Sequence, residues 1–148
     1  MMGVSRDTLF RGRILNSDEW TEGSLLRRVI KDGTGRTTAY ICPEVTASYF
    51  DGTAITYGPF YEVDPATIGQ FTGLTDRNDK RIFEGDVVEG LDFNAEDGYA
   101  VIKWDEDTAR FVIAGNGLTV DFDNYYSYEV EVISNRWDTP ELLEGGLE

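Results

Sequence analysis

Histidine is absent from this sequence of 148 residues, and cysteine occurs once, as Cys42. Without an imidazole, no Ser-His-Asp or Cys-His nucleophile can be assembled, and histidine-ligated zinc is excluded as well. A single cysteine can form neither an internal disulfide nor a thiolate metal cluster. Because Cys42 follows a short apolar run, we predict that its side chain is buried and serves packing, not catalysis.

Long apolar segments are also lacking. The first 20 residues are polar and of mixed charge, unlike a signal peptide. No window approaches the roughly 18 apolar residues that a membrane-spanning helix requires. We therefore expect a cytoplasmic protein that has no membrane partner.

Basic residues are scarce. There are 13 Lys and Arg against 28 Asp and Glu, which gives a net charge of −15. Residues 1–74 hold 7 basic and 9 acidic residues, a net charge of −2, whereas residues 75–148 hold 6 and 19, a net charge of −13. A surface this acidic repels phosphate backbones, which argues against nucleic acid as a partner. It favours a basic protein partner, or it simply keeps the protein soluble.

What the sequence does contain is the alternating pattern of β-strands. Glycine-rich or acidic turns separate several of the runs, for example at residues 32–35 and 105–107. We expect residues 16–23 to join the first two strands, and residues 43–60 to form an irregular loop. The predicted strands are Leu9–Leu15, Leu25–Ile30, Thr37–Cys42, Tyr99–Trp104, Arg110–Ala114, Leu118–Phe122 and Tyr126–Val132.

Helix signals are few. Asp64 precedes Pro65 in the arrangement of a capped first turn, and a second short helix is expected over Pro140–Glu144. The fold class is therefore mainly β with few short helices. Charge and pattern both change near residue 75, so we predict an N-terminal β region over 1–75 and an acidic region over 76–148, or one domain in which the two intertwine.

A continuous stretch of the chain, residues 61–89, closely resembles the signature of the YopX-like proteins, a family of bacteriophages and prophages. The flanks agree with the family's opening and closing motifs at Phe10–Arg13, Glu19 to Leu25, Tyr128–Val130 and Pro140–Leu143. Two positions depart from the pattern: Asp79 replaces a glycine in the hairpin turn, and Ser134 replaces a glycine near the end. The matching central positions are Val63, Pro65, Thr67 to Leu74, Asp76, Asn78 and Ile82 to Val88.

The resemblance implies an N-terminal β part packed on a C-terminal SH3-like β-barrel, and a protein made in a bacterial host cell. It brings no known activity and no catalytic residues. For the hairpin turn, Asn78-Asp79 is compatible with a type I′ conformation at a higher cost than Asn-Gly.

We interpret the central motif as structural first, with Phe71, Leu74, Ile82 and Phe83 as core anchors and Glu84-Gly85-Asp86 as a tight turn that opens a strand. No catalytic, cofactor-binding or metal-binding residue is predicted. The candidate motif or interaction residues are Arg11, Trp20, Gln70, Phe71, Thr72, Phe83, Glu84 and Asp86.

These observations favour a non-enzymatic phage or prophage accessory protein that binds another, unknown protein, and self-association is a further possibility. One alternative is an acidic decoy that occupies nucleic-acid-binding proteins. Another is a carboxylate-metal hydrolase, although Asp92–Gly98 misses the EF-hand pattern because its glycine comes one place late. A third is nucleic-acid binding by the barrel or by the basic N-terminal residues near Trp20.

Overall fold

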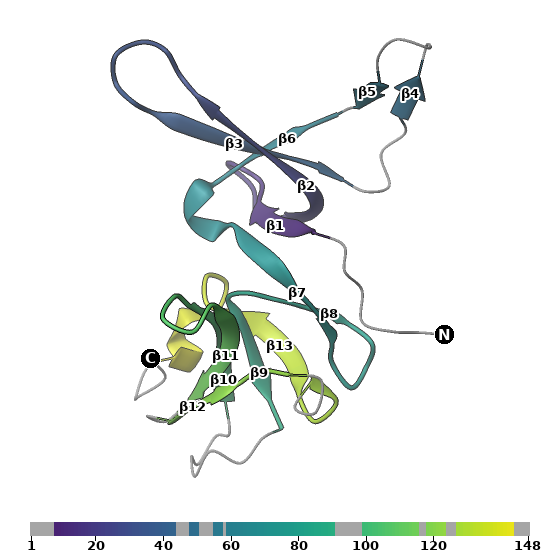
Figure 1. Cartoon of the computed structure of the whole chain (residues 1–148), viewed down its shortest axis with the longest axis vertical. Helices are drawn as coiled ribbons and strands as arrows, with labels where there is room; N and C mark the ends of the chain where they lie inside the picture. Colours follow the sequence, from purple (N-terminus) through teal and green to yellow (C-terminus); the bar gives the residue numbers. More distant parts are fainter. Residues whose placement is uncertain are drawn as a thin grey trace. The chain divides into compact units, whose positions relative to one another are not determined.

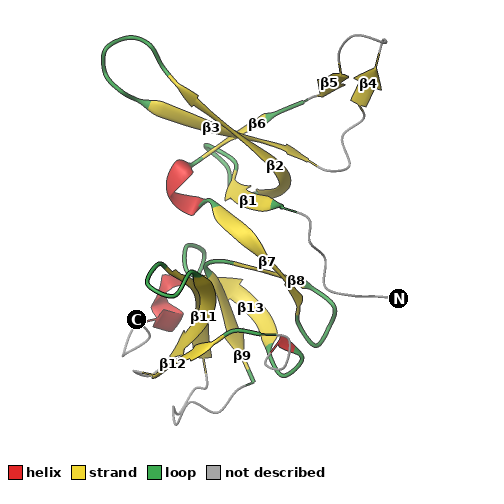
Figure 2. Ribbon diagram, in the orientation of Figure 1, coloured by secondary structure: helices red, strands yellow, loops and turns green. Residues whose placement is uncertain are grey.

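The computed structural model describes residues 8–43, 48–50, 55–57, 59–90, 99–115, 118–123 and 127–143. This part of the chain is mainly β, with antiparallel sheets and two short 3-10 helices (Figures 1 and 2). It divides into two compact units, of which the first spans Thr8–Gln70 and the second begins at Phe71. The predicted fold class, mainly β with few short helices, is confirmed.

The first unit contains an antiparallel sheet with a small apolar core. Ala39, Ile41 and Val63 are fully buried in this core. Gly12 is required there because a Cβ at this position would lie 2.9 Å from the Cβ of Val63. In spatial order the strands are β6 (Tyr61–Val63), β3 (Thr37–Pro43), β2 (Trp20–Val29), β1 (Phe10–Arg13) and the start of β7 (Gly69–Thr75).

The first two predicted strands do pair with each other, but through residues that the sequence pattern placed in their connection. Strand β1 pairs with the segment from Trp20 to Gly23, which the sequence pattern had placed in the connection. The connection is therefore shorter than expected, and Asn16 turns it with a φ of 59°. Asparagine tolerates this left-handed conformation better than most residues, so a tight turn forms without glycine.

Two described segments between residues 43 and 60 are strands, which the sequence does not indicate. They form a short hairpin in which β4 (Ser48–Phe50) pairs with β5 (Ile55–Tyr57). The interpretation as an irregular loop is therefore wrong for these two segments. Strands of three residues carry too few alternating positions for a periodicity argument to detect.

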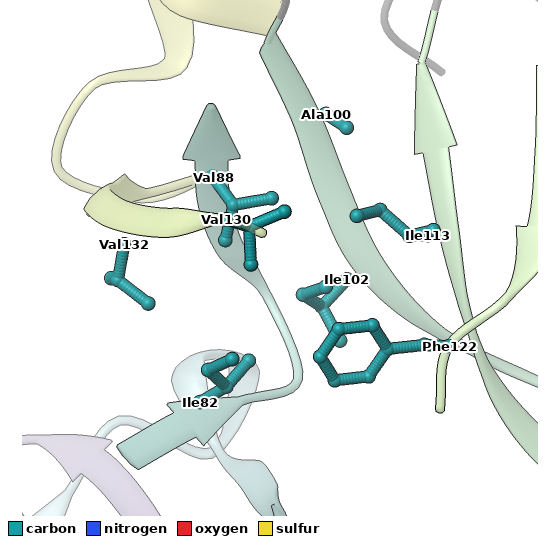
Figure 3. Packing of buried hydrophobic residues seen from close by; sticks show 8 residues of the cluster. All are labelled: Ile82, Val88, Ala100, Ile102, Ile113, Phe122, Val130 and Val132. Carbon is teal, nitrogen blue, oxygen red and sulfur yellow. The ribbon is translucent and has the colours of Figure 1, made fainter. Parts of the chain in front are cut away.

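The second unit is built around a five-stranded antiparallel sheet. Its core gathers side chains from the sheet and from β8 (Arg81–Phe83), with Ile82, Ile102 and Phe122 pointing toward one another (Figure 3). Ile82 and Ile102 are fully buried. The spatial order is β12 (Leu118–Asp121), β11 (Arg110–Gly115), β10 (Tyr99–Asp105), β9 (Asp86–Glu89) and β13 (Glu131–Asn135).

This sheet is open. Over the described residues, β12 pairs only with β11 and β13 pairs only with β9, so the two outer strands do not close on each other. A mainly β unit is thus established, but a closed SH3-like barrel is not. A register shift between Val132 and Ser134 bends β13 locally, as a β-bulge does.

The last predicted strand, Tyr126–Val132, begins too early in the sequence analysis. Strand β13 starts only at Glu131. Ser127 is helical, with its N–H donating to the Asp123 carbonyl, and Tyr128 and Glu129 form a turn. Tyr128, expected on an inward-facing position, is 61% exposed. The alternation of residue types in the sequence runs through the turn, but burial does not follow it, since Tyr128 and Glu129 are both exposed.

The short helices lie where capping chemistry predicts them. In η1 (Pro65–Thr67) the Asp64 carboxylate accepts the Ala66 N–H at 3.0 Å, and η2 spans Pro140–Leu143. Among the residues that the structure describes, no helix has the length and apolar character needed to span a membrane.

Candidate functional site

Two aromatic motif residues are core anchors of the second unit, as predicted. Phe71 and Phe83 are buried, with ring centroids 5.5 Å apart and planes tilted by 42°. The Arg81 guanidinium lies over the Phe71 ring at 5.7 Å, which adds a cation–π contact. These phenylalanines hold β7 to β8 and offer no surface to a ligand.

Thr72 serves the same contact between strands. Its hydroxyl donates to the Ile82 carbonyl at 2.8 Å and accepts the Leu74 N–H at 3.2 Å. These bonds bridge the point where the register of β7 and β8 shifts, so the side chain replaces part of the interrupted backbone ladder. Gln70, by contrast, is exposed, and its position pairs with Phe10 of β1 in the first unit.

The turn formed by Glu84 and Gly85 is tightly packed. Asp86 is fully buried and accepts the Phe83 N–H at 2.7 Å. Gly85 has a φ of +94°, and a Cβ there would lie 2.4 Å from the indole of Trp137. Glu84 is half-buried beside this turn. The predicted tight turn is confirmed, and its role is to begin β9.

One buried carboxylate was not among the predicted candidate residues. Asp76 is 2% exposed, and its Oδ1 accepts the N–H groups of Asn78 and Lys80 at 2.8 and 2.9 Å. Its Oδ2 accepts the Val132 N–H at 2.8 Å, from a strand far along the chain. An aspartate at the start of a polar turn predicts the hydrogen bonds to the Asn78 and Lys80 N–H groups. Nothing in the local sequence indicates the third.

The hairpin turn after Asp76 is not type I′. Only Asp79, with a φ of 67°, adopts the left-handed conformation, whereas type I′ requires it at both central residues. The Asp79 N–H donates to the Asp76 carbonyl and the Asp76 N–H donates to the Lys80 carbonyl. This is a type I turn followed by a left-handed residue, the geometry of a three-residue hairpin loop.

In the first unit, Arg11 and Trp20 lie together on one face of the sheet. The Arg11 guanidinium is 5.0 Å from the Trp20 ring centroid, and the Arg13 guanidinium is 5.8 Å away. Arg11 is 8% exposed, so its charge is largely buried. Arginine–indole stacking of this kind stabilises the sheet face, and we interpret both residues as structural.

The surface that is left open lies elsewhere, on the outer half of the β2–β3 hairpin. We call residues 24–38 the hairpin arm. Strand β1 pairs with β2 only as far as Gly23, and β6 pairs with β3 only as far as Ala39. The arm therefore extends beyond its neighbouring strands, as Figure 1 shows for the loop end of β2 and β3. Two of its apolar residues, Leu26 and Val29, are 51% and 63% exposed.

The hairpin arm is basic in a chain that is strongly acidic. It carries four cationic side chains, and only Arg36 forms an ion pair, with Asp32 at 3.2 Å. In the part of the chain that the structure describes, Arg27, Arg28 and Lys31 have no side-chain partner. The outer edge of β2 beyond Gly23 also has no neighbouring strand within the described ranges. This arrangement can bind an anionic, partly apolar surface.

The second unit exposes a patch of opposite character at the end of its β10–β11 hairpin. We call it the acidic tip, and it comprises Trp104, Glu106 and Asp107. Trp104 is 43% exposed and stacks edge-on against Phe111, with centroids 5.0 Å apart. Glu106 and Asp107 are exposed, and their carboxylates have no partner over the described stretch of this unit.

A metal centre is not assembled by the residues that the structure describes, since no three acidic or cysteine side chains gather there as ligands. The EF-hand-like stretch Asp92–Gly98 lies outside these residues. Cys42 is buried, as predicted.

Comparison with known proteins identifies the family. A model of the family described as YopX protein matches residues 10–144, nearly the whole chain. The chain belongs to this family. No curated protein matches the chain.

A solved structure supports the fold. The crystal structure of protein EF1440 from Enterococcus faecalis is similar to this chain with a TM-score of 0.62 and 24% sequence identity. The likeness covers 95% of this chain and 100% of the other. At this level of identity it shows that the two proteins share a fold.

Proposed function

We propose that this protein is a non-enzymatic accessory protein of a bacteriophage or prophage, and that it acts in the host cytoplasm by binding another protein. The hairpin arm is the observation that carries the proposal. Exposed apolar side chains beside unpaired cations and an open strand edge are the features that a partner strand or surface uses.

The structural roles of the other candidate residues support a binding function over catalysis. Phe71, Thr72, Phe83 and Asp86 all serve packing or backbone hydrogen bonds within the second unit. A catalytic carboxylate would need to face a substrate, whereas Asp86 is fully buried against the Phe83 N–H.

We also propose that the second unit is SH3-like. Five short antiparallel strands in meander-like order and a bulge in β13 support this classification. A crystal structure in which β12 and β13 approach each other and close the sheet would bear it out, and two widely separated outer strands would contradict it.

Site-specific photocrosslinking tests the binding role. A photoreactive amino acid placed at Leu26 in the hairpin arm should yield a defined crosslinked product in host cells. The control carries the same group at Tyr128, which is 61% exposed, somewhat more than Leu26, but lies in the second unit. Equal products from both positions, or none from Leu26, would contradict the proposed function.

A further inference from the structure

We propose that the hairpin arm binds the acidic tip of a second copy of this chain. The inference rests on the proposed function, because it assumes that the arm is a protein-binding surface. It goes further by naming the partner surface and the chemistry that joins the two.

The arm supplies cations and apolar area in the same place. Arg27 and Arg28 are adjacent on β2, so their side chains leave opposite faces of the strand, and each is flanked by an exposed apolar residue. Lys31 follows in the turn. Because none of the three has a partner within the described residues, pairing them costs no existing ion pair.

The acidic tip supplies the complement. Glu106 and Asp107 offer two exposed carboxylates without partners in the described part of the chain, and Trp104, in the same hairpin, offers a partly exposed indole. Arginine suits both groups, since its planar guanidinium pairs with carboxylates and stacks on indole rings. The exposed Leu26 or Val29 would pack against the Trp104 indole and remove apolar surface of both from water.

Charge favours a second copy over a nucleic acid. The chain has a net charge of −15, of which residues 75–148 carry −13. A polyanion would be repelled by the acidic surface of the second unit, whereas an arm that meets an acidic tip pairs opposite charges. Each chain has one arm and one tip, so every copy can both offer and receive the same contact.

Sedimentation equilibrium at about 0.05 M salt, where surface charges are weakly screened, tests the inference on the full chain. The wild type should self-associate, and R27E/R28E should weaken association by about tenfold or more because like charges then face each other. E106R/D107R should do the same. The combined variant restores opposite charges at both surfaces and has the net charge of the wild type, so association should return.

A matched control is E129R/E141R, which changes the same number of exposed carboxylates outside the acidic tip. It should still associate. Circular dichroism spectra and melting temperatures like those of the wild type show that each variant is folded. A monomeric wild type, association untouched by R27E/R28E, or a combined variant that stays monomeric would each overturn the inference.

The photocrosslinking experiment distinguishes a failure of the second-copy inference from a failure of the proposed function. A crosslink from Leu26 to a different protein, with a monomeric wild type, overturns the second-copy inference and leaves the binding role intact. If the wild type shifts duplex DNA in a gel and R27E/R28E does not, the arm binds a polyanion. That result would overturn both the second-copy inference and the proposed binding of a protein.

Discussion

Asp76 shows how a single polar residue can join distant parts of a mainly β unit. Its two oxygens accept three backbone N–H groups, two from the following turn and one from β13. Hydrogen bonds to a charged acceptor are stronger than neutral ones, and a buried N–H that loses its partner costs free energy. The side chain thus fixes both the hairpin turn and the position of β13.

The variant D76A should lower the free energy of unfolding by about 3 kcal/mol or more, because it leaves buried N–H groups without acceptors. Urea denaturation followed by fluorescence measures the loss. The control D107A removes an exposed carboxylate that has no partner in the described chain, and it should change stability by less than about 0.5 kcal/mol. Equal losses in the two variants would show that Asp76 is not a structural acceptor.

Asp79 occupies a conformation that favours glycine, with a φ of 67°. The variant D79G should raise the free energy of unfolding by about 0.5–1 kcal/mol, since glycine relieves the strain. The bond lost, from the Thr75 hydroxyl at 3.4 Å, is exposed and weak. The same substitution at Asp107, a turn residue without positive φ, should not stabilise. A less stable D79G protein would contradict the assigned turn.

At the scale of the element, the turn that ends the hairpin arm is organised by one carboxylate. Asp32 accepts the Thr34 hydroxyl, the Thr34 N–H at 2.9 Å and the Arg36 guanidinium at 3.2 Å. The Thr34 hydroxyl is the largest cause that holds the pKa of Asp32 below its ordinary value of 3.8, followed by the Thr34 N–H. Gly33 and Gly35 supply the positive φ angles of the turn.

Because the pKa of Asp32 is lowered in the folded state, its contribution is complete above pH 3.8 and is lost as the pH falls through the folded value. We expect the amide resonance of Thr34 to titrate with a midpoint below 3.8, measured by NMR. In T34V, which keeps the N–H but lacks the hydroxyl, the same turn should titrate closer to 3.8. A wild-type midpoint at or above 3.8 would be inconsistent with this bonding.

At the scale of the whole molecule, charge is distributed unevenly between the two halves of the sequence. In the second unit, Asp121 and Glu131 form ion pairs and several other carboxylates accept hydrogen bonds, whereas Glu106 and Asp107 have no partner among the described residues. Glu89 and Glu131 also lie directly opposite each other on β9 and β13. Like charges in that position destabilise a sheet.

We therefore expect the protein to melt at a higher temperature in about 0.5 M than in about 0.01 M sodium chloride, because salt screens the repulsion. Differential scanning calorimetry measures the shift. A variant with less repulsion, E89Q, should show a smaller dependence on salt. If salt leaves the melting temperature unchanged or lowers it, the carboxylates do not repel one another in the folded state.

Much of the fold could be predicted from local patterns. The strand over residues 37–43, the β10–β11 hairpin and the capped turn at Asp64 each rest on residues within a few positions of one another. The pairing of β1 with Trp20 to Gly23 could not be predicted, because it depends on where a connection turns. The candidate residues near Phe71 were found through the motif, whereas the hairpin arm was not, since exposure depends on which strands end beside it.

The sequence by itself determined the mainly β class, the family, the acidic character and the exclusion of histidine chemistry, because composition and short-range patterns are properties of the chain alone. Only the tertiary structure decided that Asp76 reaches Val132, that Tyr128 is exposed, and that Arg27 and Arg28 have no partner in the described residues. These facts depend on contacts between segments far apart in the chain, and local periodicity carries no information about such contacts.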